Sequence, residues 1–220
     1  MPYKFDATND YFSAQRKVTI LIKFAQREAN KENDFNRKLF LSLGIVQLVT
    51  CFQVFVESIL KEYEFTIKTS GRKNHNLPIF LRLNSLNLTI QSQNIDKHLK
   101  NTAQYNFERL IETKGIIDVL SKHCEDDEFI TSNFKMTTKY PLGKQGLNEL
   151  RDLLKQIEGI DIFDEATFDI NKLNEILKRR HDIIHENKNM QLTEITLKNY
   201  RDFMKDVVKY ISKYLKSKTI

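Results

Sequence analysis

The chain has 220 residues, of which 40% are apolar and 29% are charged, with only 6 Gly and 3 Pro. This length suits one domain, or at most two small ones, with a buried core. Because helix breakers are so few, the composition favours a compact, mainly helical protein and excludes collagen-like, disulfide-scaffold and disordered chains.

The net charge of +6 lies entirely in the last fifty residues. Residues 171–220 contain twelve Lys and Arg against six Asp and Glu, which leaves twenty-three of each sign in residues 1–170. A local cationic excess favours a polyanionic partner such as nucleic acid or an anionic lipid surface, although a solvated lysine-rich helix face explains it as simply.

The cysteines and the N-terminus indicate a reducing compartment. Cys51 and Cys124 have no CxxC spacing, so neither a disulfide framework nor a zinc knuckle is expected. The first residues are polar and lack the apolar stretch of a signal peptide. We therefore expect a cytoplasmic protein that needs no cofactor.

Apolar periodicity predicts a chain of helices. A first helix is expected over residues 9–28 and a long one over 37–64, and residues 65–76 are compatible with a short hairpin. Residues 125–143 have the polarity of an exposed connection. Further helices are expected at 78–88, 96–122, 145–157, from 169–171 onward, and at 193–216.

The long helix raises the alternative of a membrane span, because residues 39–60 contain no basic residue. A polar sector opposes an apolar one, however, and it includes Gln53 and Glu57. A carboxylate at that depth in lipid costs about 2.5 kcal/mol or more. We therefore expect a central helix of a bundle and no membrane partner.

The stretch 178–187 (KRRHDIIHEN) is the densest cluster of functional side chains. One interpretation is purely structural, with local Arg–Asp pairs at a helix end. Ile183 and Ile184 favour a different view, because they are expected to pull this turn against the core, where unpaired charged groups are costly.

A second interpretation is a metal site. His181 and His185 are four residues apart, as in the HExxH zinc motif, and Asp182 stands where that motif has its general base. Two adjacent arginines repel a dication, and only Glu194 and Asp202 are candidates for a third ligand.

The third interpretation is RNA cleavage without metal. His185 can act as base or acid near neutral pH, and Arg180 can hold two phosphate oxygens. The five-residue offset separates the two side chains by about 140° on an ideal helix. A second copy of the chain across a twofold axis would bring an arginine and a histidine to the same phosphate.

Residues 180–185 (RHDIIH) resemble the Arg-polar-x-x-x-His motif of the HEPN superfamily, the "higher eukaryotes and prokaryotes nucleotide-binding" domains. In that family the motif lies at the start of a penultimate or last helix. Residues 55–62 (FVESILKE) resemble the first core helix of the family. Residues 142–147 and 153–160 resemble stand-alone HEPN-like nucleases of bacterial toxin and phage-defence loci.

The resemblance implies an all-α antiparallel helical bundle formed by one domain over residues 1–220, with its core at about 33–64 and 142–216 and a helical or irregular insertion at about 65–141. It implies a metal-independent endoribonuclease that acts as a homodimer, serves as a toxin or antiphage effector, and has an antitoxin or defence-system partner. The alternative is a catalytically inactive HEPN-like dimerisation module that binds nucleotide or protein.

The resemblance also implies the roles of individual residues. Arg180 and His185 would be catalytic, with Glu57, His181 and Asp182 in support. The exposed face of the last helix would follow the RNA phosphates. We call Lys198, Arg201, Lys205, Lys209 and Lys213 the basic ridge, and we expect RNA contacts from Lys178, Arg179, Asn187, Lys198, Arg201, Lys205 and Lys209.

Overall fold

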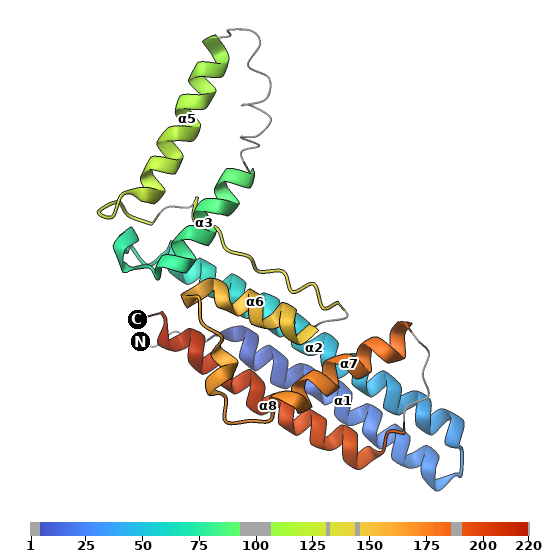
Figure 1. Cartoon of the computed structure of the whole chain (residues 1–220). Coiled ribbons are helices and arrows are strands. Elements are labelled where there is room, and N and C mark those ends of the chain that lie inside the picture. The colour runs from blue at the N-terminus through green and yellow to red at the C-terminus, as the bar shows by residue number, and fades with distance from the viewer. Residues whose placement is uncertain (1–4, 93–106, 131–132, 144–145, 186–190, 220) are drawn as a thin grey trace. The chain divides into compact units, whose positions relative to one another are not determined.

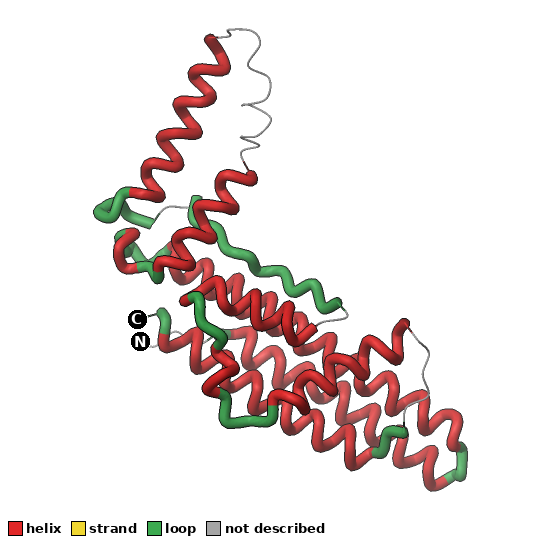
Figure 2. The backbone as a smooth tube through the Cα atoms, in the orientation of Figure 1, coloured by secondary structure: helices red, strands yellow, loops and turns green. Residues whose placement is uncertain are grey.

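The computed structural model describes residues 5–92, 107–130, 133–143, 146–185 and 191–219. These residues form α-helices and two short 3-10 helices without a strand, which confirms the all-α class (Figure 2). Backbone contacts divide the chain into two compact units. The first unit comprises residues 1–62, 138–153 and 161–220, and the second comprises 63–137 and 154–160.

The helices follow one another with short connections in most of the described chain (Figure 1). The helices predicted at 9–28, 37–64, 78–88, 145–157, from 169–171 onward and at 193–216 each have a counterpart, shifted by a few residues at its ends. Of the helix predicted at 96–122, residues 107–122 are helical, and residues 96–106 lie outside the described residues. The α-helices are α1 (Asp6–Asn30), α2 (Asp34–Lys68), α3 (Ile79–Ser92), α5 (Phe107–Cys124), α6 (Gly146–Glu158), α7 (Ile170–His185) and α8 (Glu194–Ser217), and the 3-10 helices are η1 (Asn74–Asn76) and η2 (Ile162–Glu165).

Two local predictions are wrong. No hairpin forms at residues 65–76, because α2 continues through Thr66 and Ile67, which are buried in its last turns. Packing thus overrides their preference for strands. The connection before α6 is also less exposed than its polarity suggests, since it buries Phe134, Met136 and Tyr140.

The first unit is organised around the antiparallel pair α1 and α8, which lie side by side (Figure 1). The hydroxyls of Thr8 and Ser212 are 2.8 Å apart at one end, and the Gln15 amide donates to the Arg201 carbonyl at 3.3 Å further along. The apolar stripe predicted for α8 is its buried face. This face consists of Leu197, Tyr200, Met204, Val207, Val208, Ile211 and Leu215.

Helix α2 is the most apolar element of the described chain. It is long and apolar enough to cross a membrane by length and composition, but half of its most apolar stretch is buried inside the protein. The buried face is the predicted one and includes Leu41, Ile45, Leu48 and Phe52. The opposite polar sector makes specific contacts in the first unit, which are described below.

In the second unit, side-chain amides fix the connections between helices. The Asn74 amide donates to the carbonyls of Lys122 and Glu125 at 2.6 and 2.8 Å, which holds η1 against the end of α5. Gln156 accepts from the Thr137 amide at 2.9 Å and donates to the carbonyl of the same residue at 2.7 Å. These bonds add to a short stretch of backbone pairing, in which the N–H groups of Asn74 and Ile130 donate to the carbonyls of Glu128 and Arg72 at 2.9 and 2.8 Å.

The substitution Phe52→Ala tests the core of the first unit. Phe52 is completely buried against Phe55 and Tyr140, so we expect the free energy of unfolding to fall by about 3–5 kcal/mol. Phe35→Ala is the matched control on the same helix, because the Phe35 side chain is 79% exposed, and it should change stability by less than about 0.5 kcal/mol. Equal losses in urea denaturation of the two variants would contradict this packing.

Candidate active site

Helix α7 places the motif in the first unit. The Asp169 carboxylate begins the helix by accepting from the backbone N–H of Asn171 at 2.9 Å and of Lys172 at 3.3 Å, as an N-cap residue does. Leu173, Ile176 and Leu177 are buried and fix the rotation of the helix. The family resemblance implied that the motif lies at the start of a helix. Because α7 starts at Ile170, residues 180–185 lie in its last turns instead.

Arg180 lies on the inner flank of α7. Its side chain is half-buried, and its Nε has no hydrogen-bond partner among the described residues. Burial raises the pKa of Tyr140, the Glu149 carboxylate raises it further, and the Arg180 guanidinium acts in the opposite direction. The Arg180 cation is thus within electrostatic range of the buried phenol.

Tyr140 is held by α2 and by the start of α6. Its hydroxyl donates to the Gly146 carbonyl at 2.6 Å, and its backbone N–H donates to Glu57 Oε1 at 3.2 Å. The Gln53 amide donates to the Tyr140 carbonyl at 3.0 Å. Glu57 therefore contacts the backbone of Tyr140, and no hydrogen bond joins it to Arg180 or His185 among the described residues.

The two histidines of the motif lie together. The ring centroids of His181 and His185 are 4.6 Å apart, with an interplanar angle of 39°. His181 is half-buried and its Nδ1 has no partner among the described residues, whereas His185 is exposed. Ile184 is 45% exposed, so the expectation that it packs into the core is wrong.

Within one chain the motif does not bring its arginine and its last histidine together. The described contacts pair His185 with His181, whereas Arg180 Nε has no hydrogen-bond partner among the described residues. This agrees with the separation of about 140° that helix geometry gives for a five-residue offset.

The candidate third metal ligands are engaged elsewhere. The Glu194 carboxylate forms a bidentate ion pair with Arg37, whose Nε and Nη2 donate to it at 2.7 and 2.8 Å. Asp202 pairs with Arg201 at 3.0 Å and with Lys205 at 2.9 Å. Within the described ranges no group of three His, Cys, Asp or Glu side chains is placed to hold a metal ion.

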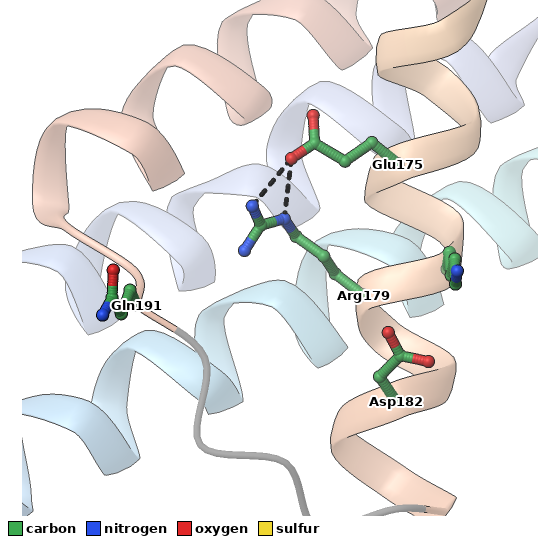
Figure 3. Close-up of a pocket in the computed structure, with 5 residues that line it drawn as sticks. Glu175, Arg179, Asp182 and Gln191 are labelled. Atoms are coloured by element: carbon green, nitrogen blue, oxygen red, sulfur yellow. Dashed lines mark hydrogen bonds and ion pairs between the residues drawn. The ribbon is translucent and has the colours of Figure 1, made fainter.

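A second polar cluster lies on the outer flank of α7 (Figure 3). Glu175 Oε1 accepts from Arg179 Nε at 2.9 Å and Nη2 at 2.7 Å, and also from the Tyr200 hydroxyl at 2.6 Å. The hydroxyl bond is the main cause of a lowered Glu175 pKa, and burial raises the pKa of Tyr200 to about 12. The Arg179 guanidinium also lies over the Tyr200 ring, 5.7 Å from its centroid, so its position is fixed on two sides.

This cluster forms one wall of a pocket of about 440 Å³. The pocket is lined by Glu175, Lys178, Arg179, Asp182 and Gln191 (Figure 3). Asp182 is only 9% exposed and has no hydrogen-bond or ion-pair partner among the described residues. The pocket therefore combines two carboxylates with two cations, and the Asp182 carboxylate is the one without a partner among the described residues.

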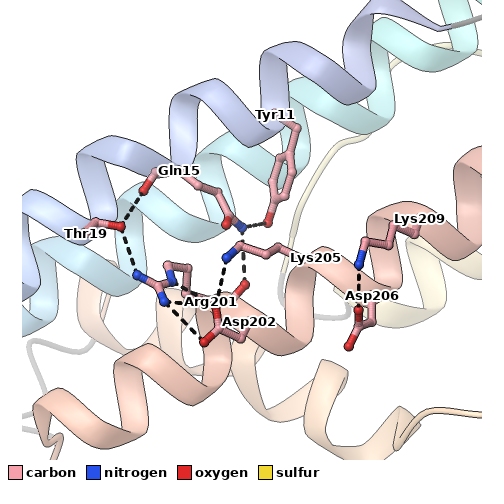
Figure 4. A network of polar contacts seen from close by, with 8 residues as sticks. All are labelled: Tyr11, Gln15, Thr19, Arg201, Asp202, Lys205, Asp206 and Lys209. Atoms are coloured by element: carbon pink, nitrogen blue, oxygen red, sulfur yellow. Dashed lines mark hydrogen bonds and ion pairs between the residues drawn. The ribbon is translucent and has the colours of Figure 1, made fainter.

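The basic ridge is less uniform than its sequence spacing suggests (Figure 4). Lys198 and Lys213 are exposed, and Lys209 is exposed beside Asp206, at 3.3 Å. Arg201 turns toward α1, where it donates to the Thr19 hydroxyl at 2.9 Å, and its side chain is only 14% exposed. Lys205 is tied to Asp202, so the free charge of the ridge lies toward its two ends.

Sequence reasoning missed Tyr140, Glu175, Tyr200 and Gln191 as neighbours of the motif. Glu175 is the one with a local signal, because it lies four residues before Arg179 on the same helix face. Asn187, which the sequence had singled out for RNA contact, lies outside the described residues.

Comparison with known proteins identifies the family. A family model described as RiboL-PSP-HEPN matches residues 9–217, nearly the whole chain. The chain therefore belongs to this HEPN family, and the resemblance found in the motif is confirmed. No curated protein and no solved structure matches the chain.

The Arg37–Glu194 pair gives a pH-dependent prediction. The Arg37 hydrogen bond lowers the pKa of Glu194 below its usual 4.5. A carboxylate whose pKa is lowered on folding stabilises the protein above the unfolded pKa and loses that effect as pH falls through the folded pKa. Glu194→Gln should therefore lower the free energy of unfolding by about 1 kcal/mol at pH 7, and its difference from wild type should vanish below the folded pKa.

Urea denaturation between pH 7 and pH 3 measures this difference. Glu165→Gln is the control, because Glu165 is exposed and should leave the whole pH profile unchanged. A Glu194→Gln profile parallel to wild type down to pH 3 would show that the ion pair does not contribute.

Proposed function

We propose that this protein is a metal-independent endoribonuclease that cleaves RNA by attack of the 2′-hydroxyl on the adjacent phosphate. Membership of the RiboL-PSP-HEPN family supports a nuclease-like role. The motif supplies the two side-chain types that this reaction requires, in Arg180 and His185.

The observation that carries the proposal is the pair of unsatisfied polar atoms in the motif. Arg180 Nε and His181 Nδ1 are both buried and have no hydrogen-bond partner among the described residues. Buried polar groups are almost always paired, so two neighbouring exceptions on one turn need an explanation. A bound phosphate would accept from the Arg180 donor and remove this penalty.

The chemistry follows from these groups. A histidine base takes the proton of the 2′-hydroxyl, and the oxygen then forms a bond to phosphorus. The bond from phosphorus to the 5′-oxygen breaks, and an acid histidine gives that oxygen its proton. Arg180 stabilises the negative charge that develops on the phosphorane. The products are a 2′,3′-cyclic phosphate and a 5′-hydroxyl.

The active site is composite and needs two copies of the chain. Arg180 and His185 diverge on α7, so one helix does not aim both at a single phosphate. A twofold axis near the end of α7 would bring the partner copy's motif to the same phosphate and supply a second acid–base histidine. The exposed Ile184 side chain offers an apolar contact beside His185 for such a dimer.

RNA would be held by the cations that the first unit leaves accessible. Lys178, Lys198 and Lys209 are exposed, and Arg179 lines the pocket on α7. Arg201 and Lys205, which are bound to Asp202, would contribute mainly to the packing of α1 and α8. We place the enzyme in the cytoplasm as a toxin or phage-defence effector, controlled by an antitoxin or another protein of its defence system.

The second candidate is an inactive HEPN-like module that binds nucleotide or protein as a dimer. The polar pocket on α7 favours it, because a pocket lined by cations and by a carboxylate unpaired among the described residues can bind a nucleotide without any cleavage. The presence of both Arg180 and His185 favours the nuclease, since family members without activity usually lack one of them.

The nuclease proposal is tested on purified protein with transfer RNA or single-stranded RNA in excess EDTA. We expect cleavage products that end in a 2′,3′-cyclic phosphate. Arg180→Ala and His185→Ala should each reduce the cleavage rate by about a hundredfold or more while the protein still folds. Arg16→Ala and His75→Ala, which change the same residue types at exposed positions, are the matched controls and should cleave like wild type.

Three results would reject the proposal. Cleavage that appears only with added zinc would favour the metal site of His181 and His185. Cleavage that survives both alanine substitutions would remove the motif from the reaction. A chain that binds nucleotide and cuts no RNA would be the inactive module.

A further inference from the structure

Asp182 is a carboxylate of the motif that the Arg180–His185 chemistry does not use. It is 9% exposed, it lines the pocket on α7, and it has no partner among the described residues. No described side chain or backbone N–H donates to its carboxylate, so a ligand in the pocket can supply the donors. An ionised carboxylate only accepts hydrogen bonds, so the ligand must present N–H or O–H groups to it.

The pocket also presents cations, and one of them is held in place. Arg179 is fixed by Glu175 and by the Tyr200 ring, so it loses little conformational freedom when a ligand binds. Lys178 is exposed at the pocket wall. Gln191 adds an amide across the pocket from α7 (Figure 3). A ligand that fits must carry adjacent donors on one edge and acceptors on another.

We propose that this pocket binds a guanine base of the RNA substrate, an inference that rests on the proposed nuclease function. Guanine carries the N1–H and N2–H donors side by side, which match the two oxygens of Asp182. Its O6 and N7 acceptors are the preferred partners of an arginine, here Arg179. Adenine and cytosine each present an amino group next to a ring acceptor, which the carboxylate would repel, and uracil presents a single N–H.

The pocket lies on the side of α7 that carries the exposed histidine. At 100° per residue, Lys178, Asp182 and His185 fall within a sector of about 60°, and Asp182 and His185 are separated by about 4.5 Å along the helix axis. Arg180 lies about 160° away from Asp182. A guanine in the pocket would therefore hold its own nucleotide next to His185. The pocket would select the base beside the cleaved bond.

Sequencing of the ends cut from a random RNA pool measures this selection. We expect guanine on one side of the cleaved bond, with a preference over adenine of about 10- to 100-fold. Asp182→Asn keeps the size of the side chain and removes one of the two acceptors, so it should reduce the guanine-to-adenine ratio of cleavage about tenfold or more, to near one. Asp164→Asn, an exposed aspartate on η2, is the control and should keep the wild-type ratio.

Binding separates failure of this inference from failure of the nuclease proposal. If the wild-type chain cuts no RNA, the nuclease proposal falls, and calorimetry with guanosine and adenosine 3′-monophosphate then tests the pocket alone. Tighter binding of the guanosine compound that Asp182→Asn removes would support the pocket. A chain without a guanine preference, or a preference that Asp182→Asn leaves unchanged, would overturn it.

Discussion

The site depends on how two polar side chains of α2 hold the backbone of Tyr140. Gln53 donates to the Tyr140 carbonyl, and Glu57 accepts from its N–H. The Tyr140 hydroxyl then binds the Gly146 carbonyl at the start of α6. These bonds satisfy the backbone of Tyr140, which is buried in a segment without regular secondary structure, and they fix the phenol within electrostatic range of Arg180. The inner flank of the motif is thus built by residues far away in the sequence.

The buried faces of the helices could be predicted from the sequence, because apolar residues repeat along them with the helical period. Leu41, Ile45, Leu48 and Phe52 share one face of α2 because of the 3.6-residue period, and all four are buried. The same period predicted the stripe on α8. The end of α2 was missed because Thr66 and Ile67 favour strands locally and are buried by tertiary packing instead. Ile184 was wrongly assigned to the core, since its exposure depends on neighbours that periodicity does not define.

The motif itself was readable from the sequence, and so was the divergence of Arg180 from His185, because both lie on one helix. The surroundings were not. Arg201 turns inward because Thr19 accepts from it across the α1–α8 pair, at a separation of 182 residues. No local pattern contains that contact.

Helix α7 therefore presents two chemically different flanks. The inner flank carries an arginine with an unsatisfied buried donor, and the outer flank carries the Asp182 carboxylate in a pocket that also presents Lys178 and Arg179. The paired histidine rings belong to the same last turns of the helix. In the proposed mechanism the inner flank holds the phosphate and the outer flank recognises the base. His185 would lie near both in a dimer.

The central claim is that Arg180 Nε donates to the phosphate of bound RNA. Nitrogen-15 NMR of arginine Nε–H groups measures this directly, with an RNA oligonucleotide made uncleavable by 2′-O-methylation and with Arg180→Lys to assign the signal. The account predicts that the Arg180 signal shifts and exchanges more slowly with water as RNA binds. An Arg180 signal that stays unchanged while RNA binding shifts other arginines would contradict it.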